Sequence, residues 1–170
     1  SRPLWAAAST HEGEEQLVLD AYLALQARGI KTRLLLAPRH PNRTPAIIKL
    51  LDARGLCFQK RSDETPLRAD TDILLIDTLG ELSAFLGLAD AAFIGGSLVP
   101  RGGHNPIEAA AWGCAVITGP HVINFATIVK DMERSGAIRV VQDEFELARQ
   151  LASVWSEDRV DGEAQVARAF

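Results

Sequence analysis

Residues 91–110 read AAFIGGSLVPRGGHNPIEAA and contain, in succession, an apolar run, a glycine-rich loop and a helix start. The run Ala91–Ile94 is short and wholly apolar, as are strands that are covered on both faces. The loop has four glycines and ends at Asn105-Pro106, a pair suited to the N-cap and the first position of a helix. A buried strand that leads through a loop into a helix is the unit of an α/β fold. The stretch therefore predicts a parallel sheet with flanking helices.

The same alternation of short apolar runs and helix-period segments continues along the chain. Strands are predicted at Leu4–Ala8, Thr32–Ala37, Leu56–Gln59, Ile73–Ile76, Ala91–Ile94, Ala115–Thr118 and Ile138–Val141. Helices are predicted at Glu14–Arg28, Thr44–Arg54, Leu82–Leu86, Pro106–Trp112, Ala126–Ser135 and Asp143–Trp155. Together they predict one doubly wound, Rossmann-like domain over residues 1–155. Residues 156–170 have only a weak helical period, and we expect a helical tail that packs against another part of the protein.

Composition excludes several classes of protein. The chain has 170 residues, 47% of them apolar and 24% charged, which is typical of one globular domain. Its net charge is −4 and no Lys/Arg run occurs, so we expect no nucleic-acid partner. No apolar run approaches the roughly 20 residues that a membrane helix needs. Cys57 and Cys114 form no CxxC pair and are predicted to be buried thiols. Without an initial Met and with a strand at its start, the sequence is expected to be part of a longer protein.

Unusual polar residues follow the predicted strands. The segments are Ser9–Glu15, Pro38–Arg43, Asp77–Glu81, Gly95–Pro106 and Gly119–Phe125, and they hold all four histidines of the chain. In an open α/β sheet, ligands bind beyond the carboxyl ends of the strands. Glycines allow close backbone approach, helix N-termini attract anions, and Arg39 and Arg101 can grip oxyanions with a planar fork. The sequence therefore predicts an anion site, although the dinucleotide and triphosphate fingerprints are absent.

Simpler interpretations of these residues stay open. Asn105 and Glu108 have the spacing of a capping box, as have Thr78 with Glu81 and Ser9 with Glu12, and a capping box needs no ligand. Arg39 could be a solvated surface charge. A metal site is disfavoured because the histidines fall on four different loops, without helical ligand spacing. The adjacent pair Gly95-Gly96 could be a turn, but its place at the end of a buried strand favours close approach of a ligand.

The blocks of sequence in these loops resemble those of one enzyme family. They are Ala8–Glu15, Pro38–Pro41, Asp77–Leu82, Ala89–Val99, Gly102–Glu108, Gly119–His121 and Asn124-Phe125. In this order and combination they resemble the transferases of 3-deoxy-D-manno-oct-2-ulosonic acid (Kdo). The resemblance covers about residues 4–155.

The resemblance implies the C-terminal domain of a GT-B glycosyltransferase, with residues 1–155 as the domain that binds CMP-Kdo. The full enzyme would move Kdo, with inversion and without metal or other cofactor, onto a lipid A precursor (lipid IVA) in lipopolysaccharide synthesis. It would work at the cytoplasmic face of the bacterial inner membrane. Membrane contact and acceptor binding would fall to an N-terminal domain, and this segment itself would be soluble. The general base would be a glutamate of that N-terminal domain, so no catalytic residue is expected in this chain.

The family's donor contacts carry over residue by residue. The CMP contacts implied are Pro38, Arg39, Leu79, Gly80, Glu81, Asn105, Pro106, Ile107 and Glu108. Further contacts to Kdo or phosphate would come from Ser9, Thr10, His11, Gly102, Gly103 and His104. Two alternatives remain: the donor domain of a GT-B transferase that uses a UDP-sugar, or a stand-alone nucleotide-binding module. The blocks Ser9–His11 and Pro38–His40 favour the Kdo family, and the unplaced tail argues against the stand-alone module.

Overall fold

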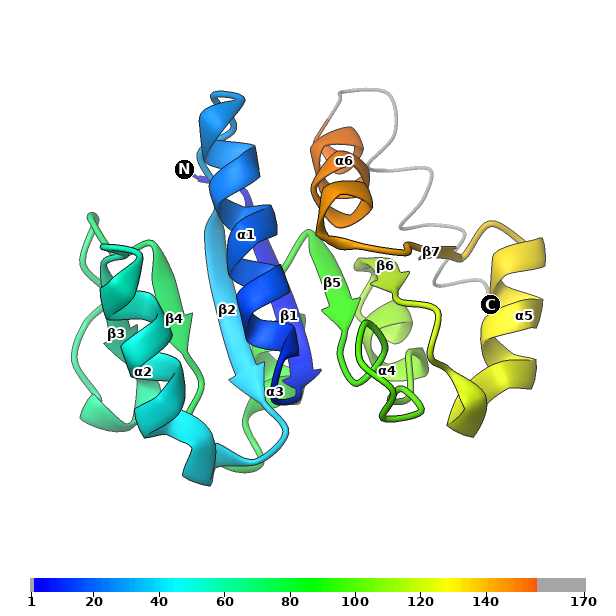
Figure 1. The fold of residues 1–170 in the computed structure, drawn as a ribbon, viewed down its shortest axis with the longest axis horizontal. Helices are drawn as coiled ribbons and strands as arrows, with labels where there is room; N and C mark the ends of the chain where they lie inside the picture. The colour runs from blue at the N-terminus through cyan, green and yellow to red at the C-terminus, as the bar shows by residue number, and fades with distance from the viewer. Residues whose placement is uncertain (1, 156–170) are drawn as a thin grey trace.

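The computed structural model describes residues 2–155, which form a seven-stranded, wholly parallel sheet (Figure 1). The strands are β1 (Leu4–Thr10), β2 (Arg33–Pro38), β3 (Phe58–Lys60), β4 (Ile73–Leu75), β5 (Ala91–Ile94), β6 (Ala115–Thr118) and β7 (Ile138–Val140). Their order is β3-β4-β2-β1-β5-β6-β7. The chain moves outward from β1 on one side and returns to place β5 on the other. The topological switch point of the sheet therefore lies between β1 and β5.

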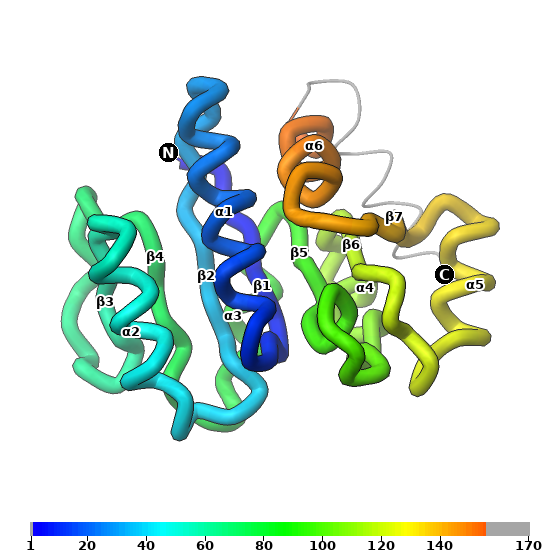
Figure 2. The backbone as a smooth tube through the Cα atoms, in the orientation of Figure 1, coloured from blue at the N-terminus to red at the C-terminus, as the bar shows by residue number. Residues whose placement is uncertain are grey.

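Helices cover both faces of the sheet (Figures 1 and 2). They are α1 (Glu14–Ala27), α2 (Thr44–Ala53), α3 (Leu82–Leu86), α4 (Ile107–Ala111), α5 (Ala126–Arg134) and α6 (Glu144–Val154). Three short 3-10 helices, η1 (Pro41–Arg43), η2 (Arg61–Asp63) and η3 (Ile123–Phe125), lie in the connections. All predicted strands and helices are confirmed, with ends shifted by a few residues. The 3-10 turns were not predicted because three residues show no hydrophobic period.

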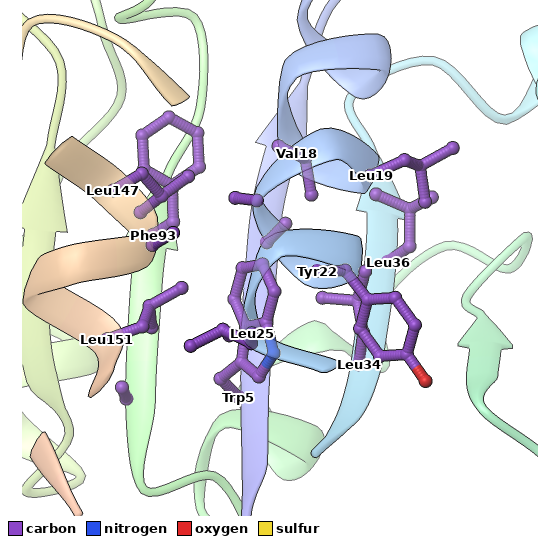
Figure 3. Packing of buried hydrophobic residues seen from close by; sticks show 14 of the residues in the cluster. Trp5, Val18, Leu19, Tyr22, Leu25, Leu34, Leu36, Phe93, Leu147 and Leu151 are labelled. Carbon is purple, nitrogen blue, oxygen red and sulfur yellow. The ribbon is translucent and has the colours of Figure 1, made fainter. Parts of the chain in front are cut away.

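The core has two layers because successive side chains of a strand point to opposite faces. Trp5 and Ala7 pack with α1, α2 and α6, whereas Ala6 and Ala8 pack with α3, α4 and α5. Figure 3 shows the first layer, in which Tyr22 of α1 lies beside Leu34 of β2 and Leu25 of α1 lies beside Trp5 of β1. Every residue of β5 and β6 is buried, which explains their unbroken apolar sequences.

The predictions for the cysteines, for a membrane-spanning helix and for the C-terminal tail have different outcomes. Cys114 is buried as predicted, but Cys57 is only half-buried because it lies at the start of the sheet's outermost strand. No helix within residues 2–155 is long and apolar enough to cross a membrane. The predicted helical tail, residues 156–170, lies outside the described residues.

Candidate functional site

The carboxyl ends of β1, β2, β4 and β5 bring the predicted loops together beside the switch point. Ser9 lies at the centre, where the pairing of β1 with β2 shifts register between Ala8 and Thr10. Its φ of 59° is unusual for a residue with a side chain. Strained residues of this kind concentrate at functional sites.

Two small pockets adjoin at Ser9 and Leu82, which line both of them. The β4-side pocket, of about 190 Å³, is lined by Pro38 and Arg39 and by the loop Thr78–Gly80. The α4-side pocket, of about 180 Å³, is lined by His104, Asn105 and Glu108. The structure thus gathers six of the predicted CMP contacts and two of the predicted Kdo or phosphate contacts. They are Pro38, Arg39, Leu79, Gly80, Asn105 and Glu108, with Ser9 and His104.

His11 and His104 form a pair, although they come from different loops. Their Nε2 atoms are 2.8 Å apart and their rings are parallel within 3°. Burial, followed by the charges of His104 and Arg101, lowers the pKa of His11 to about 4. Burial, followed by Arg39 and His40, lowers the pKa of His104. The pair is therefore neutral at pH 7, and one ring donates its N–H to the other.

The positive charge of the site comes from Arg39 and Arg101. Both guanidinium groups are exposed, and neither forms a hydrogen bond or ion pair within residues 2–155. His40 approaches the edge of the His11 ring, with centroids 5.7 Å apart. His121 joins the site only through its backbone, since its N–H donates to the carbonyl of Ser97. The charges of the two arginines thus create an environment that favours an anion, and three of the four histidines lie nearby.

Glu14 is a part of the site that sequence reasoning missed. Its side chain is completely buried, and its carboxylate accepts the backbone N–H groups of His11, Gly96, Ser97 and Leu98 at 2.8–3.1 Å. Burial raises its pKa, and the four N–H groups oppose that shift. The predicted capping pair Ser9 with Glu12 does not form, because α1 begins later and Glu14 binds the N–H of His11. The signal in the sequence was an acidic residue directly after Gly13, which takes the left-handed conformation with φ 85°.

The interpretation of Gly95-Gly96 as a place for ligand approach was wrong. A Cβ on Gly95 would lie 2.4 Å from the carbonyl oxygen of Ser9, and one on Gly96 would lie 3.1 Å from the His104 ring. The absence of side chains at the two glycines therefore allows other parts of the chain, and not a ligand, to pack closely against them. Glu14 moreover occupies the N–H groups of residues 96–98, so these cannot bind an external anion.

Of the four remaining predicted Kdo or phosphate contacts, His11 lines neither pocket and the other three lie deeper than expected. Gly102 and Gly103 are buried, and a Cβ on either would meet the loop after β6 at Asn124 or at His121 and Val122. Thr10 is also buried, and its hydroxyl has no hydrogen-bond partner within residues 2–155. These three residues shape the loops and do not line either pocket.

At the start of α4, Asn105 acts as a helix cap, whereas the side chain of Glu108 does not. Asn105 Oδ1 accepts the N–H of Ile107 at 2.9 Å, which is one half of the predicted capping box. The side chain of Glu108 is exposed and makes no hydrogen bond within residues 2–155, so the other half is missing. Its carboxylate is therefore available to the α4-side pocket, which it lines. Pro106 and Ile107 line neither pocket.

Glu81 is engaged by the protein itself. Arg61 donates Nε and Nη2 to its carboxylate at 3.1 and 3.0 Å, and the Thr78 hydroxyl donates to the same group. These two partners, Thr78 first, lower the pKa of Glu81. The predicted capping pair Thr78 with Glu81 is thus a bond between side chains. Glu81 fixes the loop that presents Leu79 and Gly80, while its own carboxylate lies outside both pockets.

The histidines of this edge do not gather into a metal centre. No group of three His, Cys, Asp or Glu side chains in residues 2–155 is placed to hold a metal ion.

Comparison with known proteins gives close matches. No protein-family model matches the sequence. The chain is 43% identical over 140 residues to the 3-deoxy-D-manno-octulosonic acid transferases of Haemophilus influenzae and Bordetella pertussis, covering 82% and 80% of its own length. It spans about a third of the length of these curated relatives, 33% in each case.

Solved structures agree with these relatives. The C-terminal CMP-Kdo binding domain of WaaA from Acinetobacter baumannii superposes with a TM-score of 0.92 and 30% identity, covering 99% of this chain and 88% of that one. WaaG, a glycosyltransferase involved in lipopolysaccharide biosynthesis, matches with a TM-score of 0.60 and 15% identity, covering 99% of this chain and 42% of that one. At that identity the likeness concerns the fold alone. The predicted fold, a C-terminal domain of the GT-B type, is confirmed.

Proposed function

Since the chain belongs to the 3-deoxy-D-manno-octulosonic acid transferases, we propose that it binds CMP-Kdo as the donor domain of an inverting glycosyltransferase. The observation that carries the proposal is the convergence of Pro38, Arg39, Leu79, Gly80, Asn105 and Glu108 on two adjoining pockets at the switch point. Nucleotide ligands bind at this position in doubly wound sheets.

The chemistry of the pockets suits the donor. CMP-Kdo carries a phosphate and a sugar carboxylate, which can accept charge-assisted hydrogen bonds from Arg39, in the lining of the β4-side pocket. Arg101 lines neither pocket, but it is close enough to His11 for its charge to act on that ring. The His11–His104 pair places two uncharged imidazole rings near these arginines. Glu108 has both carboxylate oxygens free to accept hydrogen bonds from ribose hydroxyls. The proposal includes no metal and no cofactor, because the two arginines supply the positive charge.

In this proposal the chain supplies the donor half of the reaction. An inverting displacement needs a base that deprotonates the acceptor hydroxyl, and such a base contributes roughly 10²–10⁴-fold to the rate. The proposal assigns the base, the lipid A acceptor and contact with the cytoplasmic face of the inner membrane to the rest of the protein. The steps that we propose for this chain are donor binding and stabilisation of the departing CMP phosphate by Arg39 and Arg101.

Calorimetric titration of the chain with CMP and with UDP tests the proposal. We expect CMP to bind at least about tenfold more tightly, a difference of about 1.4 kcal/mol. Tighter binding of UDP would favour a donor domain for a UDP-sugar. Binding of neither nucleotide would contradict the donor-domain assignment.

A further inference from the structure

The contact between His11 and His104 depends on the relative position of two separate loops. His11 follows β1 and His104 precedes α4, 93 residues later in the sequence. Their Nε2 atoms are 2.8 Å apart, and a hydrogen bond weakens steeply when its distance or angle changes. The pair therefore needs an element that fixes one loop against the other.

Glu14 connects these two loops directly. Its Oε2 accepts the N–H of His11 at 3.1 Å and the N–H of Gly96 at 2.8 Å. Its Oε1 accepts the N–H groups of Ser97 at 3.1 Å and Leu98 at 3.0 Å. One carboxylate thus binds the β1–α1 loop with one bond and the β5–α4 loop with three bonds. Charge-assisted bonds in a buried place are among the stronger hydrogen bonds of a protein.

Gly96 links the hydrogen bonds of Glu14 to the positions of the two imidazole rings. A Cβ at Gly96 would lie 3.1 Å from Cδ2 of His104 and 3.2 Å from Cδ2 of His11, so its backbone packs against both imidazoles. The carbonyl of Gly96 also accepts the N–H of Gly103, the residue before His104. A displacement of Gly96 would therefore displace both rings.

We propose that Glu14 is a positioning residue that holds the His11–His104 pair in register, so that the pair faces the anionic part of the donor. The part that concerns the donor rests on the proposed function. The placement of the pair does not, because it follows from contacts within the chain.

Glu14→Gln is the variant that tests this role. Gln has the same shape, but its amide nitrogen would face two N–H donors where the carboxylate has an acceptor, so the anchor is lost on one side. NMR titration of the imidazole groups follows the pair without any ligand. We expect His11 to titrate near pH 4 in the wild type, and nearer to 6.5 in the variant as its ring becomes less buried and separates from His104 and Arg101. An unchanged His11 titration in folded Glu14→Gln overturns the proposal.

Two further variants keep the test decisive. Glu15→Gln removes the neighbouring buried carboxylate, which binds Arg43 at 2.7 Å and neither loop of the pair, and it should leave the His11 titration unchanged. A shift in this control as large as that of Glu14→Gln would overturn the specific role of Glu14. If Glu14→Gln does not fold, Glu14→Asp carries the same expectation, because its charge remains but its shorter side chain cannot reach both loops.

Titration with CMP tests the link to the donor. We expect Glu14→Gln to bind CMP about tenfold more weakly than the wild type, with each affinity taken from folded protein. A shifted His11 with unchanged CMP affinity would contradict the role toward the donor. If the wild type binds no CMP, the proposed function fails, and the imidazole titration still decides the positioning role.

Discussion

The two edges of the sheet differ both in the size of their cavities and in whether their charged side chains are paired, and the larger cavity is not at the edge with the unpaired charges. A cavity of about 540 Å³ lies at the amino ends of β1 and β5, larger than either pocket at the carboxyl edge. Its charged groups are paired within the protein: Asp90 accepts hydrogen bonds from Leu4 N and Trp155 Nε1, and Arg2 forms an ion pair with Asp72, although Arg2 Nε has no partner among the described residues. At the carboxyl edge, Arg39, Arg101 and Glu108 have no such partners among the described residues. Unsatisfied charge, and not volume, therefore distinguishes the edge at which we propose that the donor binds.

Gly95→Ala should have the largest effect on stability, because it disrupts the close packing of β5 against the end of β1 at the carboxyl edge. The added Cβ would lie 2.4 Å from the backbone carbonyl oxygen of Ser9, which cannot move without shifting the end of β1. We expect a loss of about 2–3 kcal/mol in the free energy of unfolding, measured with denaturant.

Gly29→Ala serves as the control for this variant. Gly29 has a φ of 79°, but a Cβ added there would meet no atom of the described residues within 4 Å, so only backbone strain of about 1 kcal/mol is expected. Equal losses in the two variants would show that the close contact between Gly95 and Ser9 does not hold this edge together.

Arg39→Ala should separate binding from folding at the carboxyl edge. The guanidinium makes no contact within residues 2–155 that supports the fold, and as a partner of phosphate it would contribute about 1.5–3 kcal/mol to binding. We expect CMP affinity to fall about 10- to 150-fold, with no change in the free energy of unfolding. Calorimetric titration measures this directly, and unchanged affinity would return Arg39 to the class of solvated surface charges.

Asp90→Ala should give the opposite pattern at the amino edge. The loss of an acceptor for Leu4 N and Trp155 Nε1 should lower the free energy of unfolding by about 1–2 kcal/mol. The CMP affinity of the folded protein should stay the same. If affinity falls in Asp90→Ala as it does in Arg39→Ala, the functional contrast between the edges does not hold.

The sheet was predictable because its strands are buried on both faces and read as unbroken apolar runs, as in Ala91–Ile94. That the histidine-bearing loops gather at one edge of the sheet was predictable because they all follow such strands. The contacts between these loops were not. His11 and His104 lie 93 residues apart, and no spacing rule joins two loops at that separation.

The role of Glu14 was hidden for a different reason. An acidic residue in a first helical turn is normally a solvated charge, and only the fold shows that Gly96–Leu98 points its N–H groups at this one. Gly95 shows another limit of prediction from sequence. A glycine in a sequence signals close approach, but it cannot say whether a ligand or another part of the chain approaches.

The contrast between the edges is tested most directly by NMR of the ¹⁵N-labelled chain during titration with CMP. We expect the backbone amide signals of Arg39, Gly80 and Ile107 to move in a saturable manner, while those of Leu4, Leu88 and Trp155 stay in place. Movement confined to the amino edge, or movement at neither edge at concentrations that saturate calorimetric binding, would contradict the assignment of the carboxyl edge as the donor site.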